Sequence, residues 1–282
     1  MTTDPRPTPD PTASRGRTWF ARLTATGTET EAGATSPGPI GSVLSAPAPL
    51  GDTSAWFLAV VPDPQGRFPR AHRGEVGLEE GWHLAAEVRA VVEADADLPP
   101  EAKRPVVAIV DVPSQAYGHR EELVGIHQAL AAAVDAYATA RLAGHPVIAF
   151  VVGNAISGAF LAHGLQADRI IALDDEAVQV QVMSKQATAR ITRRTLAELA
   201  EAAEKVPATA YDGASFAKLG ALHRLIPGDC DTPTALAALA EAAADARRGP
   251  HDLSPRLTSP EALRARAASV ETRRRLAASW EG

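Results

Sequence analysis

The chain has 282 residues, of which 45% are hydrophobic and only 5% aromatic, and its formal net charge is −6. This length suffices for one large domain with an aliphatic core, and the charge lacks the basic surplus of a general nucleic-acid-binding protein. A single cysteine, Cys230, excludes an intramolecular disulfide and any metal site built from several cysteines. This cysteine usage favours a cytoplasmic protein.

Residues 1–40 are predicted to be largely disordered or loosely docked. Eight of the 22 prolines fall in the first 50 residues, among Thr, Ser, Asp and Gly, so there is little to bury. A short apolar patch at 19–23 suggests a helix that docks on the body. The first residues lack the apolar core of a secretory signal. No apolar run approaches the roughly 20 residues that span a bilayer, so we expect no membrane partner.

The next part, residues 41–230, is predicted to form the main domain. A strand at 54–61 is followed by a helix at 79–94, and the run VVAIVDV at 106–112 is typical of a strand buried on both faces. The following helix is predicted from apolar residues that recur at three- and four-residue steps, and Gly144 before Pro146 ends it. These apolar residues are Leu123, Ile126, Leu130, Val134 and Tyr137.

A second buried strand is predicted at 147–152, ending at Gly153, and a helix opens directly after it. A strand at 169–173 and a strictly alternating segment at 177–182 follow. The order strand, helix, strand predicts parallel strands joined by right-handed crossovers. Helices are then expected to the C-terminus, at 195–205, 211–219, 233–248 and 260–280, the last two within a helical part at 231–282. The predicted fold class is α/β with a helical C-terminal part.

Two glycine-containing turns follow the buried strands: a first turn, residues 111–118, and a second turn, residues 153–159. Ligand sites of parallel sheets lie at the carboxyl ends of the strands. Unpaired N–H groups at a helix start attract anions, and glycine allows the backbone to approach a ligand closely. Two such turns would suit a reaction that passes through an enolate or another oxyanion. The alternative is that both turns only pack helix against strand.

Other catalytic groups are weaker candidates. Ser157 could be a nucleophile, but it lacks the flanking glycines of a nucleophile elbow, and His163 lies six residues further along the same predicted helix. The histidines at 119, 127, 145 and 163 have no carboxylate or histidine partner at helical spacing, so we expect no metal site.

Four segments, in order, resemble biotin-dependent carboxyltransferases. Residues 111–126 resemble their D-V-P-G-F-x-x-G-x-x-Q-E-x-x-G-I segment, and residues 152–160 their I-T-R-K-A-Y-G-G-A-Y segment. The strand ending at Met183 is similar to I-A-V-M-G-P-E-G, and residues 217–226 to the A-x-x-G-x-x-x-x-I close of crotonase-fold domains. The chain departs from these carboxyltransferase segments at Ser114, at Ser157-Gly158 and at residues 184–187. With these differences it looks most like the gamma subunit of biotin-independent malonate decarboxylase.

This resemblance implies a crotonase-like (ClpP/crotonase) spiral of ββα units over roughly residues 40–230. It implies a site shared with a homologous beta subunit that decarboxylates a malonyl thioester on an acyl carrier protein to an acetyl thioester and CO2. The substrate would arrive on a phosphopantetheine-type, coenzyme-A-like arm of the carrier. Neither biotin nor a metal would be bound by this chain.

We hypothesise that backbone amides in the two turns stabilise the enolate left by the loss of CO2. The catalytic candidates are Tyr117, Gly118, Ser157 and Gly158. The substrate-binding candidates are Ser114, Gln115, Ala116, Gly153, Asn154, Ile156, Met183 and Ser184. Which turn holds the thioester and which holds the departing carboxylate stays open at this point.

Three alternatives remain open. The first is a carboxyltransferase subunit that passes CO2 to biotin, although Ser114 and Ser157 favour the decarboxylase. The second is a serine hydrolase on the same fold that uses Ser157. The third is a non-catalytic scaffold that only completes the site of a partner.

Overall fold

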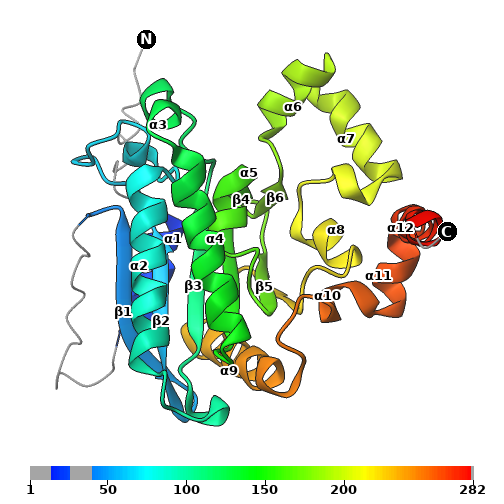
Figure 1. Ribbon diagram of the computed structural model, residues 1–282. Coiled ribbons are helices and arrows are strands. Elements are labelled where there is room, and N and C mark those ends of the chain that lie inside the picture. The colour runs from blue at the N-terminus through cyan, green and yellow to red at the C-terminus, as the bar shows by residue number, and fades with distance from the viewer. Residues whose placement is uncertain (1–13, 26–39, 281–282) are drawn as a thin grey trace.

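A single sheet forms the centre of the molecule (Figure 1). The computed structural model describes residues 14–25 and 40–280, so the disorder expected in 1–13 and 26–39 lies outside the described residues. Within the described part the sheet has seven strands in the order β1-β2-β3-β4-β5-β7, with β6 beside β4. The strands are β1 (Val43–Leu50), β2 (Thr53–Val60), β3 (Val106–Val112), β4 (Val147–Ile156), β5 (Arg169–Asp174), β6 (Gln179–Gln181) and β7 (Arg224–Pro227).

Helices cover both faces of this sheet. In Figure 1, α2 and α4 lie side by side on one face, and α1 lies behind the strands. Beyond β5, helices α6, α7 and α10 to α12 extend away from the sheet. The helices are α1 (Arg15–Thr24), α2 (Leu78–Ala94), α3 (His119–Leu123), α4 (Ile126–Leu142), α5 (Ser157–Ala162), α6 (Lys185–Thr192), α7 (Leu196–Lys205), α8 (Gly213–Lys218), α9 (Thr232–Arg248), α10 (Pro255–Thr258), α11 (Pro260–Ala265) and α12 (Ala267–Trp280).

The strand pairing confirms the prediction of an α/β domain with parallel strands. β1 and β2 form an antiparallel pair, and every other neighbouring pair is parallel. β1 was not predicted, because its sequence contains Pro47 and Pro49. Proline cannot donate to a ladder, so it is tolerated in strands mainly at sheet edges, and β1 is the edge strand. The two prolines are two residues apart and can both direct their nitrogens away from β2.

Helix α1 packs firmly on the sheet. Trp19, Phe20 and Leu23 are buried, and the Trp19 ring lies edge-on to that of Phe150 at a centroid distance of 5.2 Å. Such aromatic contacts stabilise beyond the area that they bury. The division of the chain at residues 40 and 230 stays a prediction. Among the described residues, α9 also contacts β4 and β5 through a row of buried alanines.

The predicted apolar stripe of the helix after β3 was correct only in part, since Ile126 and Tyr137 are buried and the other three residues are not. Leu123 is 72% exposed and lies in the separate short helix α3, and Leu130 and Val134 are only half-buried. Helix α4 instead buries its alanines against α2. A side chain at Gly81 of α2 would come within 2.7 Å of the Ala129 backbone, so the two helices touch closely. Small residues allow this approach, and a count of large apolar residues misses it.

Three other boundaries differ from the prediction. β4 continues through Gly153 to Ile156, because a register shift in its pairing with β3 extends the ladder. Of the alternating segment 177–182 only β6 is a strand, and Val182 is 69% exposed. The predicted helix at 260–280 is divided into α11 and α12, and α6 was not predicted. No helix in the described ranges is both long and apolar enough to cross a membrane.

Candidate active site

A cavity of about 390 Å³ lies where β3 and β4 end, and we call it the site cavity. Seven of the twelve predicted site residues line it, so the fold brings parts of both turns together. Its lining residues are Glu75, Pro113, Ser114, Gln115, Tyr117, Ile156, Ser157, Val182, Met183, Ser184, Ala187 and Arg190. Glu75 and Arg190 were not predicted. They stand outside the motifs, and only the fold places them here.

The first turn is held by backbone pairing with a distant residue. The Val76 N–H donates to the Ser114 carbonyl at 3.1 Å, and the Ala116 N–H donates to the Val76 carbonyl at 2.8 Å. Ala116 is buried and does not line the site cavity. The Tyr117 N–H donates to the Gln115 carbonyl at 3.0 Å. This bridge fixes the backbone from which the Gln115 side chain projects.

The second turn changes direction at Ser157, whose φ of 65° is in the left-handed region. Residues other than glycine hold this conformation at a cost, so the surrounding contacts must favour it. The Ser157 hydroxyl donates to Gln115 Oε1 at 2.6 Å, and the Gly158 N–H donates to the same oxygen at 2.8 Å. A Cβ at Gly158 would lie 2.5 Å from that oxygen. One side-chain carbonyl therefore joins the two turns.

The four predicted amide donors differ in their surroundings. The N–H groups of Tyr117 and Gly158 are engaged by Gln115, as described above. No described residue accepts a hydrogen bond from the Gly118 N–H. The Ser157 N–H directly follows Ile156, whose parallel pairing with Gln181 places it at the end of the β4–β6 ladder. The role of these amides in catalysis stays a prediction.

Gly153 and Asn154 lie inside β4 rather than in an open turn. The Asn154 N–H donates to Asp111 Oδ1 at 3.0 Å, and a Cβ at Gly153 would come within 2.1 Å of the same oxygen. Asp111 Oδ2 accepts the Gly16 N–H of α1 at 3.2 Å. These residues anchor α1 to the sheet and do not line the site cavity. Glycine at 153 is required by the close approach of a carboxylate from the same protein.

Charged groups lie on two sides of the site cavity. Glu75 accepts hydrogen bonds from Arg70 Nε at 2.5 Å and from Arg73 at 2.8 Å. The Arg70 guanidinium also lies 4.0 Å from the Tyr117 ring centroid, in a cation–π arrangement. Arg190 projects from α6, and no described residue forms an ion pair with it. The carboxylate of Glu75 is thus compensated, whereas the Arg190 cation is not.

A buried carboxyl group lies beneath the first turn. Glu121 is 2% exposed, and its Oε1 accepts the Leu78 N–H at 3.3 Å. Burial, with smaller contributions from the nearby Glu80 and Glu75, raises the pKa of Glu121 to about 7. The sequence gives no local signal of this burial, because it comes from α2, which is remote in sequence.

The histidine in the helix after Ser157 serves the core. The Tyr137 hydroxyl donates to His163 Nδ1 at 2.9 Å, and Nε2 donates to the Ile109 carbonyl at 3.0 Å. Burial lowers the pKa of His163 to about 4, so the ring is neutral. Both ring nitrogens are occupied, and Ser157 has no hydrogen bond from a histidine among the described residues. Nor do three or more His, Cys, Asp or Glu side chains of this part converge as a metal site.

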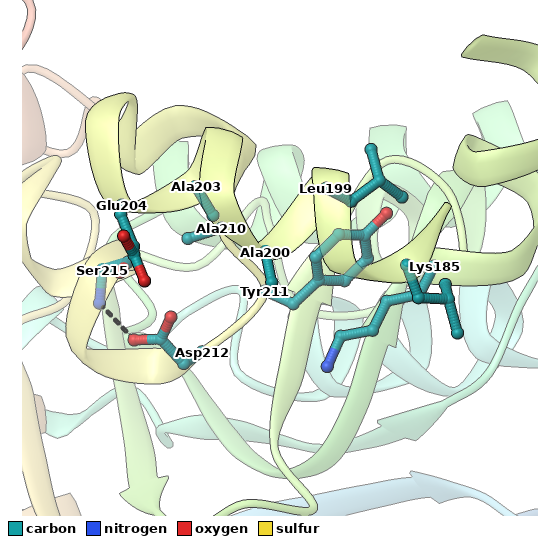
Figure 2. A pocket seen from close by; sticks show the side chains of 10 residues that line it. Lys185, Leu199, Ala200, Ala203, Glu204, Ala210, Tyr211, Asp212 and Ser215 are labelled. Carbon is teal, nitrogen blue, oxygen red and sulfur yellow. Dashed lines mark hydrogen bonds between the residues drawn. The ribbon is translucent and has the colours of Figure 1, made fainter. Parts of the chain in front are cut away.

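The structure has two further cavities in this region. One of about 380 Å³ shares Ser157 and Val182 with the site cavity and is mainly apolar. Another of about 550 Å³ is lined by residues of α6, α7 and α8 (Figure 2). There the Lys185 ammonium lies 5.4 Å from the Tyr211 ring centroid, and Asp212 accepts the Ser215 N–H at 2.8 Å. Asp212 is therefore occupied as a helix cap, and Lys185 is the basic group of this cavity.

Residues 71–280 match the family of malonate decarboxylase gamma subunits. This chain belongs to that family. A chain of a Pseudomonas malonate decarboxylase hetero-tetramer in complex with coenzyme A is 50% identical, with a TM-score of 0.82 over 95% of this chain and all of the other. A chain of the Pseudomonas MdcD-MdcE hetero-dimer is 49% identical, with a TM-score of 0.81 over 95% and 99% of the two chains. The expected resemblance is confirmed.

Two more distant relatives define the limits of the comparison. The malonyl-S-ACP:biotin-protein carboxyltransferase MADD of Malonomonas rubra is 40% identical over 161 residues, which are 57% of this chain and 55% of that protein. The match therefore spans just over half the length of this relative. The transcarboxylase 12S structure is 21% identical with a TM-score of 0.55, over 73% of this chain and 36% of the other, and supports the fold alone. The crotonase-like fold expected from the sequence is confirmed.

Proposed function

We propose that the chain is the gamma subunit of a malonate decarboxylase and forms, with a homologous beta subunit, the site that releases CO2 from a malonyl thioester. The observation that carries this proposal is 50% identity across the full length of a chain from the Pseudomonas hetero-tetramer. The MdcD-MdcE hetero-dimer supports a beta-type partner. The substrate is a malonyl group on an acyl carrier protein, in keeping with the malonyl-S-ACP in the name of the Malonomonas relative.

The reaction breaks the bond between the malonyl methylene carbon and the carboxylate. The electron pair of that bond moves into the thioester and leaves an enolate, and protonation of the methylene carbon then gives the acetyl thioester. Donors fixed before the reaction favour the charge that develops on the thioester oxygen. Of the four predicted donors, the Gly118 N–H is the one that neither Gln115 nor the β4–β6 ladder engages, and we assign it to this role.

The phosphopantetheine arm of the carrier brings the thioester to the site, and we propose that this chain binds neither biotin nor a metal. The mainly apolar cavity next to Ser157 is suited to the uncharged part of such an arm. We also expect the complex to work in the cytoplasm.

The experiment is reconstitution. This chain, the beta subunit and the malonyl-loaded carrier are purified, and CO2 release is measured with each chain left out in turn. We expect release to require both crotonase-type chains. Full release by the beta subunit without this chain would overturn the proposal.

A second candidate is carboxyl transfer to biotin, which the 40% identity to the Malonomonas carboxyltransferase favours. The two activities differ in the fate of the carboxyl group. Adding a biotinylated carrier domain to the reconstituted complex distinguishes them. A decarboxylase releases CO2 at the same rate with or without biotin, whereas a carboxyltransferase forms carboxybiotin and depends on the added domain.

A further inference from the structure

The orientation of the Gln115 side chain is fixed by the donors around it. Gln115 Oε1 receives the hydroxyl of Ser157 at 2.6 Å and the N–H of Gly158 at 2.8 Å. A backbone N–H can only donate, so the atom that it meets must be the carbonyl oxygen of the amide. The two ends of the amide group are therefore not interchangeable here.

The nitrogen end of the same amide remains available. Gln115 lines the site cavity, and no described residue accepts a hydrogen bond from Nε2. Nε2 is also absent from the buried polar atoms that lack a partner, so solvent reaches it. The second turn thus holds the oxygen of Gln115, and the side chain offers two N–H donors to the cavity.

Two other donors line the same cavity. Ser184 Oγ accepts the Ala187 N–H at 3.2 Å as the cap of α6, which leaves its O–H to donate elsewhere. Arg190, six residues further along α6, has no ion-pair partner among the described residues. The acceptor carboxylate of Glu75 is already bound by Arg70 and Arg73. The available groups are donors, and one of them is a cation.

We propose that Gln115 Nε2, the Ser184 hydroxyl and Arg190 form a binding site for the carboxylate of the malonyl group. A carboxylate accepts hydrogen bonds only and prefers charged donors, which matches this set. The inference deepens the proposed function and rests on it. It assigns the carboxylate to this chain's Gln115 side chain, so that Ser157 and Gly158 act as positioning residues through Oε1.

The opposite role for Gln115 is a plug. Its Oε1 would then occupy the place of a substrate oxygen and would have to leave before the substrate binds. The two roles give opposite results when the side chain is removed, because a plug inhibits and a binding residue assists.

The decisive variant is Gln115→Glu. The carboxylate of Glu keeps an oxygen for Ser157 and Gly158 and replaces the two N–H donors with a negative charge. In the assembled complex we expect KM for malonyl-carrier to rise roughly 30-fold, which corresponds to about 2 kcal/mol. The inhibition constant of the product acetyl-carrier, which lacks the carboxylate, should stay within about twofold of wild type.

Two other variants test the same carboxylate site. Gln115→Ala should raise KM about 10-fold, in the range for loss of hydrogen bonds to a charged group. Arg190→Gln should raise KM for malonyl-carrier about 10-fold without changing acetyl-carrier inhibition. Arg194→Gln is the matched control, since Arg194 is exposed and does not line the site cavity, and it should leave both constants unchanged.

The possible outcomes distinguish the proposed carboxylate site from its alternatives. Faster turnover or tighter malonyl-carrier binding by Gln115→Ala would establish the plug and overturn the inference. Equal loss of malonyl- and acetyl-carrier binding in Gln115→Glu would reduce Gln115 to a structural residue and also overturn it. If the wild-type complex releases CO2 and Gln115→Glu binds malonyl-carrier normally, only this inference fails. If the wild-type complex releases no CO2, the proposed function itself fails.

Discussion

Two regions of the chain border the cavities: the carboxyl ends of β3 and β4, and the arm, which is formed by α6 and α7. They differ in how many contacts with the rest of the chain hold them in place. At the strand ends the contacts are internal: Val76 pairs with the first turn, Asp111 anchors β4, and Gln115 joins the turns. Helices α6 and α7 have no buried residues, and Ile191 and Leu196 are 63% and 51% exposed. Contacts within this chain therefore fix one wall of the site, and the other wall leaves apolar side chains exposed. Exposed apolar groups of this kind are typical of interaction surfaces.

The largest effect is expected where α1 meets the sheet. Phe150 is fully buried against Trp19, so Phe150→Ala should lower the free energy of unfolding by about 3–5 kcal/mol through lost burial and a cavity. Urea denaturation of the purified chain measures it. A loss below about 1 kcal/mol would mean that contacts within the chain do not hold the strand ends tightly.

Gly153→Val should destabilise the chain by about 2–3 kcal/mol, because a Cβ there would lie 2.1 Å from Asp111 Oδ1. Gly213→Ala is the control, since its nearest neighbour is the end of the Leu225 side chain at 3.2 Å. Equal stability of the two variants would contradict the tight contact between Asp111 and β4.

The buried Glu121 predicts a pH dependence. Its pKa is about 7 in the folded chain and 4.5 in an ordinary setting, so between these values the folded state retains a proton that the unfolded state has lost. Its contribution to stability is therefore lost as the pH rises through this window. Glu121→Gln should stabilise the chain at pH 8 by on the order of 1 kcal/mol and change little at pH 4.5.

Thermal unfolding of wild type and Glu121→Gln across pH 4.5–8 checks this prediction. The comparison with wild type is needed because burial also raises the pKa of the neighbouring Glu80, which contributes in the same direction. Parallel pH curves for the two proteins would show that Glu121 does not titrate in this range.

The smallest effect on the isolated chain is expected in the arm. Leu196→Ser should change the free energy of unfolding by less than about 0.5 kcal/mol, because the side chain is half exposed. It should nevertheless weaken binding of the beta subunit, which titration calorimetry can measure. If the isolated chain lost more than about 1 kcal/mol of unfolding free energy, contacts within the chain would hold the arm in place, and the contrast with the strand ends would be wrong.

The same contrast explains what the sequence could predict. β3 and the longer part of β4 were predicted correctly, because continuous apolar runs bounded by Pro and Gly have few other solutions. The face of α4 was predicted only in part: Ile126 and Tyr137 are buried, but most of the packing uses alanines that a search for large apolar residues passes over. The candidate site residues came from motifs, and seven of them line one cavity, but their roles stay predictions.

The contacts that define the site could not be predicted. Gln115 meets Ser157 across 42 residues of sequence, and Asp111 meets Gly16 across 95. Neither pairing follows from local periodicity, since each depends on the register of β3 against β4 and on the docking of α1. The burial of Glu121 likewise depends on α2, from which Leu78 donates to its carboxylate.

The most direct test of the claim that these turns take part in the chemistry is Gly158→Val in the reconstituted complex with the beta subunit and malonyl-loaded carrier. A Cβ at Gly158 would lie 2.5 Å from Gln115 Oε1, so the variant breaks the contact between the turns. We predict that the subunits still assemble and that CO2 release at low substrate concentration falls roughly 10-fold, as expected when Gln115 no longer holds the substrate carboxylate. Near-normal release by a correctly assembled Gly158→Val complex would contradict the account.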